Sequence, residues 1–344
     1  MNGQVADIKS TAVDRQLGGL ATILSLLGAK SFEHEEYVAR FQRDGFLYLP
    51  GFYSDVEIAE VLAATETLLA AGDCPVTVDS LESNQRHYWR HIRDVADNLS
   101  YKFNDLYLFE PAIRELAMGK RLSSILKALM GDKAVLCNSL SFAVGSQQPP
   151  HVDSLYMTPQ TPNKLLATWI ALEDVHSDAG PMSYYPGSHL IPRYIFADGS
   201  RHVIDSEMPD WHAYMDSQVK VRGLEQKTFL AKKGDVFIWH SELLHGGSAI
   251  DNPALTRRSL VSHYYCERDC RRLRSDLQAM HDGYWMRRAP AGVPCQPGDF
   301  TESSFPEANY LARYGDVAKA VRAGRVKSGY QHWLNDGCAE GRLV

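Results

Sequence analysis

Two short segments of this sequence carry the residue types of a metal site. His151 and Asp153 stand two positions apart after Pro149-Pro150, and His245 follows at a second, glycine-rich segment. Side chains two positions apart on an extended segment point to the same face. Two histidines and one carboxylate can form a facial triad, which holds Fe(II) on one side and leaves its other positions open. The pattern therefore predicts an iron site made by His151, Asp153 and His245.

A plainer explanation competes with this one. The chain contains 13 histidines, so one His-x-Asp pair is expected by chance and would then lie on the surface. The context favours a metal site, because apolar strands are predicted on both sides and an arginine follows the second segment by a dozen residues. His240, in the same region, is an alternative to His245 as the third ligand.

The elements that would position these residues are short strands. Apolar or alternating runs separated by turn-rich segments occur at 134–144, 165–172, 182–185, 227–230, 235–239 and 258–266. Such runs favour a sandwich or barrel. Capping residues and helical apolar spacing predict earlier helices at 31–43, 54–70 and 111–130. We therefore expect an α+β fold, with a double-stranded β-helix (jelly-roll or cupin-like) core buttressed by N-terminal helices and followed by a small C-terminal helical module.

The chain divides into four predicted parts. Residues 1–30 form a helical leader, and residues 31–285 form the domain that carries the chemistry. A Pro/Gly-rich composition predicts a linker at 286–303, and aromatic residues at helical spacing predict the helical module at 304–344. Two roles stay open for this module: a contact with a protein partner or a second copy of the chain, or a stabilising cap.

Composition excludes several classes of protein. The formal net charge of −6 does not provide the basic face that a nucleic-acid partner requires. We expect no membrane partner, because no apolar run approaches the roughly 18 residues of a membrane-spanning helix. The six cysteines are scattered without a paired framework, which favours reduced thiols and a cytoplasmic location. Cys266 and Cys270 lack a second pair at zinc-site spacing and are interpreted as structural.

A series of motifs resembles a known family. Residues from about 38 to 266 resemble the phytanoyl-CoA dioxygenase family of Fe(II)/2-oxoglutarate oxygenases. No single motif is decisive, and the resemblance depends on their shared order and spacing. The motifs are FQRDGFLYLPGF at 41–52, HVD at 151–153, TWIALED at 168–174, GPM at 180–182, PGSH at 186–189, GDV at 234–236, LLHGGS at 243–248 and RRSL at 257–260.

The resemblance implies roles for particular residues. His151, Asp153 and His245 match the family's iron ligands, and His245 is preferred over His240 because it precedes the Gly-Gly-Ser turn. The family anchors the far carboxylate of 2-oxoglutarate with an arginine, whose guanidinium makes two parallel charge-assisted hydrogen bonds. Register favours Arg257 for this role, and its neighbour Arg258 is the alternative. Lys102 and Trp169 match positions near the cosubstrate, although a solvated lysine and a packed aromatic are the ordinary interpretations of these two.

The resemblance also implies a reaction. With Fe(II), 2-oxoglutarate and O2, the enzyme would hydroxylate an unactivated C–H bond of a small or medium-sized metabolite and release succinate and CO2. Desaturation, cyclisation or epoxidation would use the same cofactors, and a non-catalytic jelly-roll metal-binding or scaffold protein is the alternative from another class. Candidate substrate residues mix polar and aromatic groups, and they are His87, Tyr88, Asn138, Gln148, Tyr156 and Met157.

Overall fold

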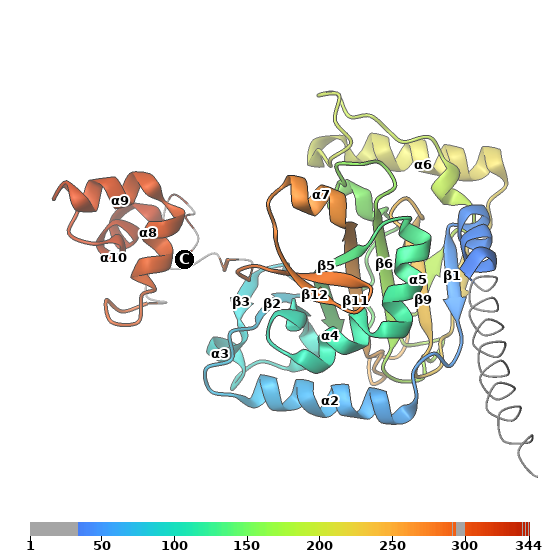
Figure 1. The fold of residues 1–344 in the computed structure, drawn as a ribbon, viewed down its shortest axis with the longest axis horizontal. Coiled ribbons are helices and arrows are strands. Elements are labelled where there is room, and N and C mark those ends of the chain that lie inside the picture. Colours follow the sequence, from blue (N-terminus) through green and yellow to red (C-terminus); the bar gives the residue numbers. More distant parts are fainter. Residues whose placement is uncertain (1–33, 291, 294–299, 339, 341, 343) are drawn as a thin grey trace, which may run out of the picture.

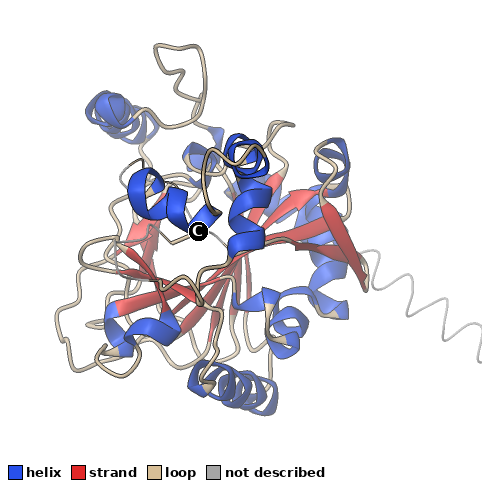
Figure 2. Ribbon diagram, turned by 90° about the vertical axis from the view of Figure 1, so that its left-hand side faces the viewer, coloured by secondary structure: helices blue, strands red, loops and turns tan. Residues whose placement is uncertain are grey.

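The computed structural model describes residues 34–290, 292–293, 300–338, 340, 342 and 344. The leader predicted at 1–30 lies outside them. In the described part, strands lie in the middle of the molecule and helices surround them (Figures 1 and 2). No helix in these residues has the length and apolar character needed to cross a membrane.

Most of the described strands belong to one large sheet. Its main path has the order β1-β9-β6-β11-β5-β4-β2-β3, and the hairpin of β12 and β13 joins it through β13, which pairs with β5 in parallel. The strands are β1 (Phe46–Leu49), β2 (Thr77–Ser80), β3 (Arg86–Tyr88), β4 (Tyr101–Asn104), β5 (Ala134–Phe142), β6 (Leu165–Ala171), β9 (Val236–His240), β11 (Ser259–Cys266), β12 (Asp276–Met280) and β13 (Gly283–Arg287).

A smaller sheet completes the core. It has the order β10-β7-β8, with β7 at Met182–Tyr184, β8 at Lys227–Phe229 and β10 at His245–Gly247. Alternate residues of the large sheet, such as Trp169 and Phe237, pack against Met182 and Phe229 of the small sheet in one apolar cluster. Two sheets facing each other over such a core form a double-stranded β-helix, so the predicted α+β jelly-roll fold is confirmed.

Helices cover the opposite face of the large sheet. Leu166, Ile170 and Ile238 point to this face and pack with residues of the helices. The helices and helical turns of the domain are residues 34–44, α2 (Asp55–Ala70), α3 (Trp89–Ile92), α4 (Pro111–Met118), α5 (Lys120–Met130), α6 (Met208–Arg222) and α7 (Glu267–Arg272). Ser54 and Glu57 form a capping box at the start of α2, which satisfies two backbone N–H groups there.

The structure differs from the predicted elements in two places. The single helix predicted at 111–130 is wrong, because the chain breaks at Gly119 between α4 and α5. A Cβ on Gly119 would lie 2.6 Å from the Glu115 carbonyl oxygen, so only glycine allows this close approach. Residues 72–108, where the sequence pattern predicts no strand, contain β2, β3 and β4, which extend the large sheet. Strand β13 spans Gly283–Arg287, and the domain boundary at residue 285 stays a prediction.

The C-terminal helices form a group with a core of their own. They are α8 (Glu307–Arg313), α9 (Gly315–Arg322) and α10 (Gly329–His332), and they lie to one side of the sheets (Figure 1). Their buried cluster contains Phe305, Tyr310 and Trp333. Tyr88 packs at its edge and donates a hydrogen bond to the Val344 carbonyl at 3.4 Å.

Candidate metal centre

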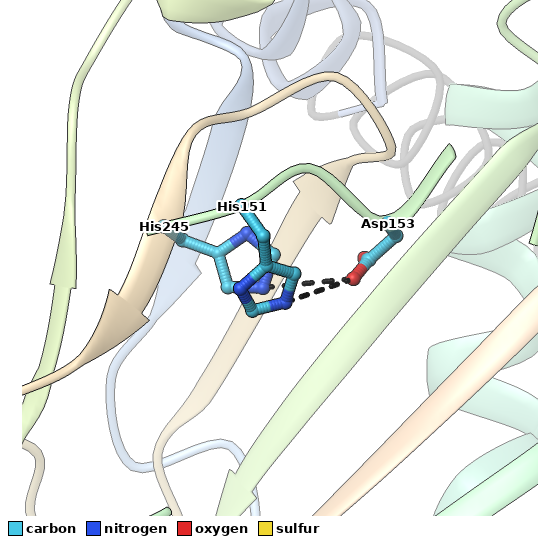
Figure 3. A group of neighbouring side chains, drawn as sticks. All are labelled: His151, Asp153 and His245. Atoms are coloured by element: carbon cyan, nitrogen blue, oxygen red, sulfur yellow. Dashed lines mark ion pairs between the residues drawn. The ribbon is translucent and has the colours of Figure 1, made fainter. Parts of the chain in front are cut away.

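Backbone pairing brings the two predicted histidines together. His151 forms an isolated antiparallel bridge with His245, the first residue of β10. Each backbone N–H donates to the other's carbonyl, at 2.8 and 3.0 Å. Asp153 begins a short 3-10 turn that directs its carboxylate toward the two imidazoles. Figure 3 shows the three side chains converging on one space.

The three side chains present suitable atoms to a metal ion. One possible ligand atom from each residue lies within 4.8 Å of the other two. Asp153 Oδ1 is 3.8 Å from His151 Nε2 and 3.6 Å from His245 Nε2. The Nδ1 atoms of both histidines lie 2.9 Å from backbone carbonyls. Because carbonyls only accept, each Nδ1 carries the proton and each Nε2 keeps a free lone pair for a metal.

The charge states also suit a metal. Burial lowers the pKa of His151 to about 4, and neighbouring His245 adds to this effect. The imidazole of His151 is therefore neutral at neutral pH, as a ligand must be. Burial opposes a negative charge on Asp153, but the neighbouring imidazoles of His245 and His263 outweigh burial and hold its pKa below the ordinary value.

His240, the alternative ligand, lies on the other face of its strand. Its ring packs near Phe41 and His189, with centroids 6.2 and 5.5 Å away. Trp239, one residue earlier, instead faces the metal centre, because successive strand residues alternate between faces. The structure therefore brings His245, and not His240, to His151 and Asp153.

The three residues line a pocket, and Arg257 lines the same pocket. Arg257 is only 3% exposed, and among the described residues no carboxylate forms an ion pair with it. It donates one hydrogen bond to the Gly180 carbonyl at 3.2 Å, and its Nε has no partner. The indole N–H of Trp169, whose ring lies 5.6 Å from the guanidinium carbon, has none either. Burial lowers the pKa of Arg257 to about 10.

These features fit the expected cofactors. Two neutral imidazoles and a carboxylate are ligands that Fe(II) accepts, and they leave positions for a keto acid and oxygen. Buried donors without partners are costly unless a ligand satisfies them. A buried guanidinium and an indole N–H are suitable donors for the far carboxylate of 2-oxoglutarate. The rest of the lining is mainly apolar and includes Leu140, Phe142, Trp169, Met182, Trp239 and Val261.

Two other predicted cosubstrate residues lie elsewhere. Arg258 points away from the pocket, half-exposed, with its Nε 4.0 Å from Glu173. Lys102 does not line the pocket, and its ammonium is 3.5 Å from Asp79, which also binds Arg86 at 2.6 Å. Its contact with the cosubstrate stays a prediction.

The predicted substrate residues are spread over several environments. Gln148 lines the pocket. Tyr156 is 47% exposed and its ring lies 5.9 Å from that of His151, so it stands at the edge of the centre. His87 lies on β3 and packs near Tyr101 of β4. Tyr88 contacts the C-terminal helices.

The remaining two are Met157 and Asn138. Met157, a partly buried residue, follows the Asp153 turn and donates its backbone N–H to the Asp153 carbonyl. Asn138 is occupied by other protein groups. Its Nδ2 donates to Asp105 at 3.0 Å, and its Oδ1 lies 3.0 Å from Nδ1 of His263.

Two further residues at the centre were not predicted. The indole N–H of Trp239 donates to Asp153 Oδ2 at 2.8 Å. His263 Nε2 lies 3.7 Å from the same oxygen. A period of two along the last core strand, counted from Arg257, reaches His263 and would have suggested that both face the pocket. Residue type alone carried no such signal for Trp239.

Comparisons with known proteins agree with this site. The profile of the phytanoyl-CoA dioxygenase (PhyH) family matches residues 41–259. A phytanoyl-CoA dioxygenase of Arabidopsis thaliana is 24% identical over 265 residues, covering 67% of this chain and 87% of the relative. Phytanoyl-CoA dioxygenase domain-containing protein 1 of Danio rerio is 23% identical over 151 residues, covering 42% of this chain and only half of the relative.

A solved structure shares the fold. The non-heme alpha-ketoglutarate-dependent epimerase SnoN from nogalamycin biosynthesis is 22% identical, covers 75% of this chain and 99% of its own, and has a TM-score of 0.50. The family profile spans more than half of the chain and includes all three converging residues. The chain therefore belongs to the phytanoyl-CoA dioxygenase family of Fe(II)- and 2-oxoglutarate-dependent oxygenases.

Proposed function

We propose that this oxygenase hydroxylates an unactivated C–H bond of a small or medium-sized metabolite and forms succinate and CO2 from 2-oxoglutarate. The observation that carries the proposal is the buried His151, Asp153 and His245 group in the same pocket as a buried arginine that no carboxylate of the described residues pairs with. A structural metal site needs no such arginine, so Arg257 favours an enzyme over a scaffold protein.

Each residue of the chain has a defined task in this proposal. His151 and His245 would hold iron through Nε2, and Asp153 would hold it through Oδ1. Iron bound there supplies the oxidising chemistry, in which dioxygen and 2-oxoglutarate together oxidise a C–H bond. Arg257 would orient 2-oxoglutarate by its far carboxylate, with Trp169 as a second donor.

The lining of the pocket supports the same chemistry. Leu140, Phe142 and Val261 give the space beside the three ligands an apolar lining, and a less polar surrounding strengthens the electrostatic interactions of Arg257 with an anion. Gln148 and Tyr156 supply polar groups at the pocket and its edge. We propose that these two contact the substrate, and that their mixed character suits a polar metabolite.

The decisive experiment measures succinate. The purified protein is incubated with Fe(II), 2-oxoglutarate and oxygen, alone and with a panel of small metabolites, beside the Asp153→Ala variant. We expect metal-dependent succinate formation in the wild type only, stimulated by the true substrate. Mass spectrometry then separates hydroxylation, which adds one oxygen atom, from desaturation or cyclisation, which removes two hydrogens. Equal succinate from both proteins would refute the oxygenase proposal.

A further inference from the structure

The two oxygens of the Asp153 carboxylate have different neighbours. Oδ1 faces the Nε2 atoms of His151 and His245, at 3.8 and 3.6 Å. Oδ2 accepts a hydrogen bond from the Trp239 indole at 2.8 Å. It also lies 3.7 Å from Nε2 of His263. The side chain is therefore held with one oxygen toward the two imidazoles and the other toward the large sheet.

Strand pairing and burial hold Trp239 beside Asp153. It lies on β9, where Ala167 and Phe46 are its partners on the neighbouring strands, and it is 2% exposed. Its ring also contacts His245, with centroids 5.0 Å apart. An indole N–H can only donate and an ionised carboxylate can only accept, so the direction of the bond to Asp153 is unambiguous.

The second oxygen is further enclosed by a chain of hydrogen bonds. His263 Nδ1 lies 3.0 Å from Asn138 Oδ1, and Asn138 Nδ2 donates to Asp105 at 3.0 Å. Arg288 donates to the other oxygen of Asp105 at 2.6 Å. Since arginine only donates and the Asp105 carboxylate only accepts, this chain holds the His263 ring in place beside Asp153.

We propose that Trp239 is a positioning residue that reserves Oδ2 of Asp153, so that the carboxylate offers a metal Oδ1 alone. The terminal torsion of an aspartate is broad, so without the indole donor the carboxylate could turn or offer both oxygens. A one-oxygen contact keeps more of the metal's positions open for the cosubstrate and oxygen. This inference rests on the metal site of the proposed function, but it concerns metal binding and not turnover.

The test separates the indole N–H from the bulk of the ring. Trp239→Phe keeps an aromatic ring against His245 and removes the donor, whereas Trp239→Gln loses the ring but keeps an N–H group near the same distance from the backbone. Trp333→Phe is the matched control, because Trp333 is fully buried in the C-terminal cluster and its indole N–H has no partner. Equilibrium dialysis with Co(II), an oxygen-stable substitute for Fe(II), measures affinity without turnover.

The expected result is specific. Loss of a hydrogen bond to a metal-binding side chain typically weakens metal affinity about 10- to 100-fold. Trp239→Phe should therefore weaken Co(II) binding at least tenfold, and Trp239→Gln should recover part of the affinity. Trp333→Phe should bind Co(II) like the wild type. The rise in Tm caused by Co(II) should shrink most in Trp239→Phe, less in Trp239→Gln and not in Trp333→Phe, which a purely structural role would not produce.

Two results would overturn the inference. One is Trp239→Phe binding Co(II) within about twofold of the wild type, since that is well below the usual effect of such a residue. The other is Trp239→Gln binding no better than Trp239→Phe, which would show that an N–H donor at this position does not restore metal affinity. Failure of the wild type to produce succinate would refute the proposed function, while the dialysis would still decide the role of Trp239.

Discussion

Replacement of Arg257 by methionine should remove the binding of 2-oxoglutarate without weakening the fold. Burial lowers the pKa of Arg257 from its ordinary 12.5 to about 10. Each pKa unit corresponds to about 1.4 kcal/mol, so burial disfavours the charged side chain by roughly 3 kcal/mol. The side chain is charged in the folded and the unfolded chain below about pH 10, so the whole cost applies at neutral pH. No acidic side chain among the described residues forms an ion pair that offsets it.

A bound dicarboxylate would offset this cost. Truncating one member of a buried, hydrogen-bonded ion pair typically costs about 2–5 kcal/mol, and each 1.4 kcal/mol changes Kd about tenfold. Arg257→Met should therefore weaken 2-oxoglutarate binding by about 30-fold or more. The Tm of the ligand-free protein should stay the same or rise, because an unpaired buried charge has been removed.

The matched control is Arg258→Met. Arg258 is half-exposed, and its Nε lies 4.0 Å from Glu173. Exposed ion pairs contribute only about 0–1 kcal/mol. Isothermal titration of 2-oxoglutarate into the Co(II)-loaded proteins, with thermal melts of the ligand-free proteins, measures both quantities. If Arg257→Met lowers Tm by several degrees and keeps wild-type affinity, the arginine is structural; if Arg258→Met shows the larger loss of affinity, the assignment within the pair is reversed.

Three other predictions concern the metal and the turns. His245→Ala should lose Co(II) binding by equilibrium dialysis while His240→Ala keeps it within a few-fold, because only the former faces Asp153; equal losses would contradict the assignment. Adding metal to the chelator-treated protein should raise Tm, because a metal concentration of 100 times Kd stabilises the folded protein by about 2.7 kcal/mol. An unchanged Tm would argue against a metal site in the folded protein. Gly234→Ala should lower Tm strongly, since φ is +85° and an added Cβ would collide with the Tyr53 carbonyl; a wild-type melt would show that this turn can relax.

Much of the site follows from local patterns. Strand periodicity places His151 and Asp153 on one face, and it separates Trp239 from His240 and Arg257 from Arg258 without any coordinates. The same patterns locate most core strands to within a residue or two, because apolar runs bounded by glycine and proline have few alternatives. The helix break at Gly119 escaped this reasoning, since the apolar spacing continues through it and the break lies in the backbone conformation of Gly119 beside the Glu115 carbonyl.

Partners across the structure could not be derived in this way. Strands β2, β3 and β4 have weak local patterns, and they form because β5 offers an edge to pair with. The ion pair between Lys102 and Asp79 depends on the pairing of β2 with β4, which places the two residues opposite each other. The hydrogen bond from Trp239 to Asp153 likewise joins residues that are 86 positions apart.

The sequence by itself determined the chemistry of this protein: which side chains can bind iron, which arginines can bind a dicarboxylate, and which of them share a strand face. Only the tertiary structure decided which of these groups meet, that Arg257 is buried and has no acidic partner in the described part of the chain, and that Trp239 donates to the second oxygen of Asp153. The physical reason is that periodicity reports the direction of a side chain relative to its own backbone. Its partners and its desolvation depend on segments that are distant in the chain.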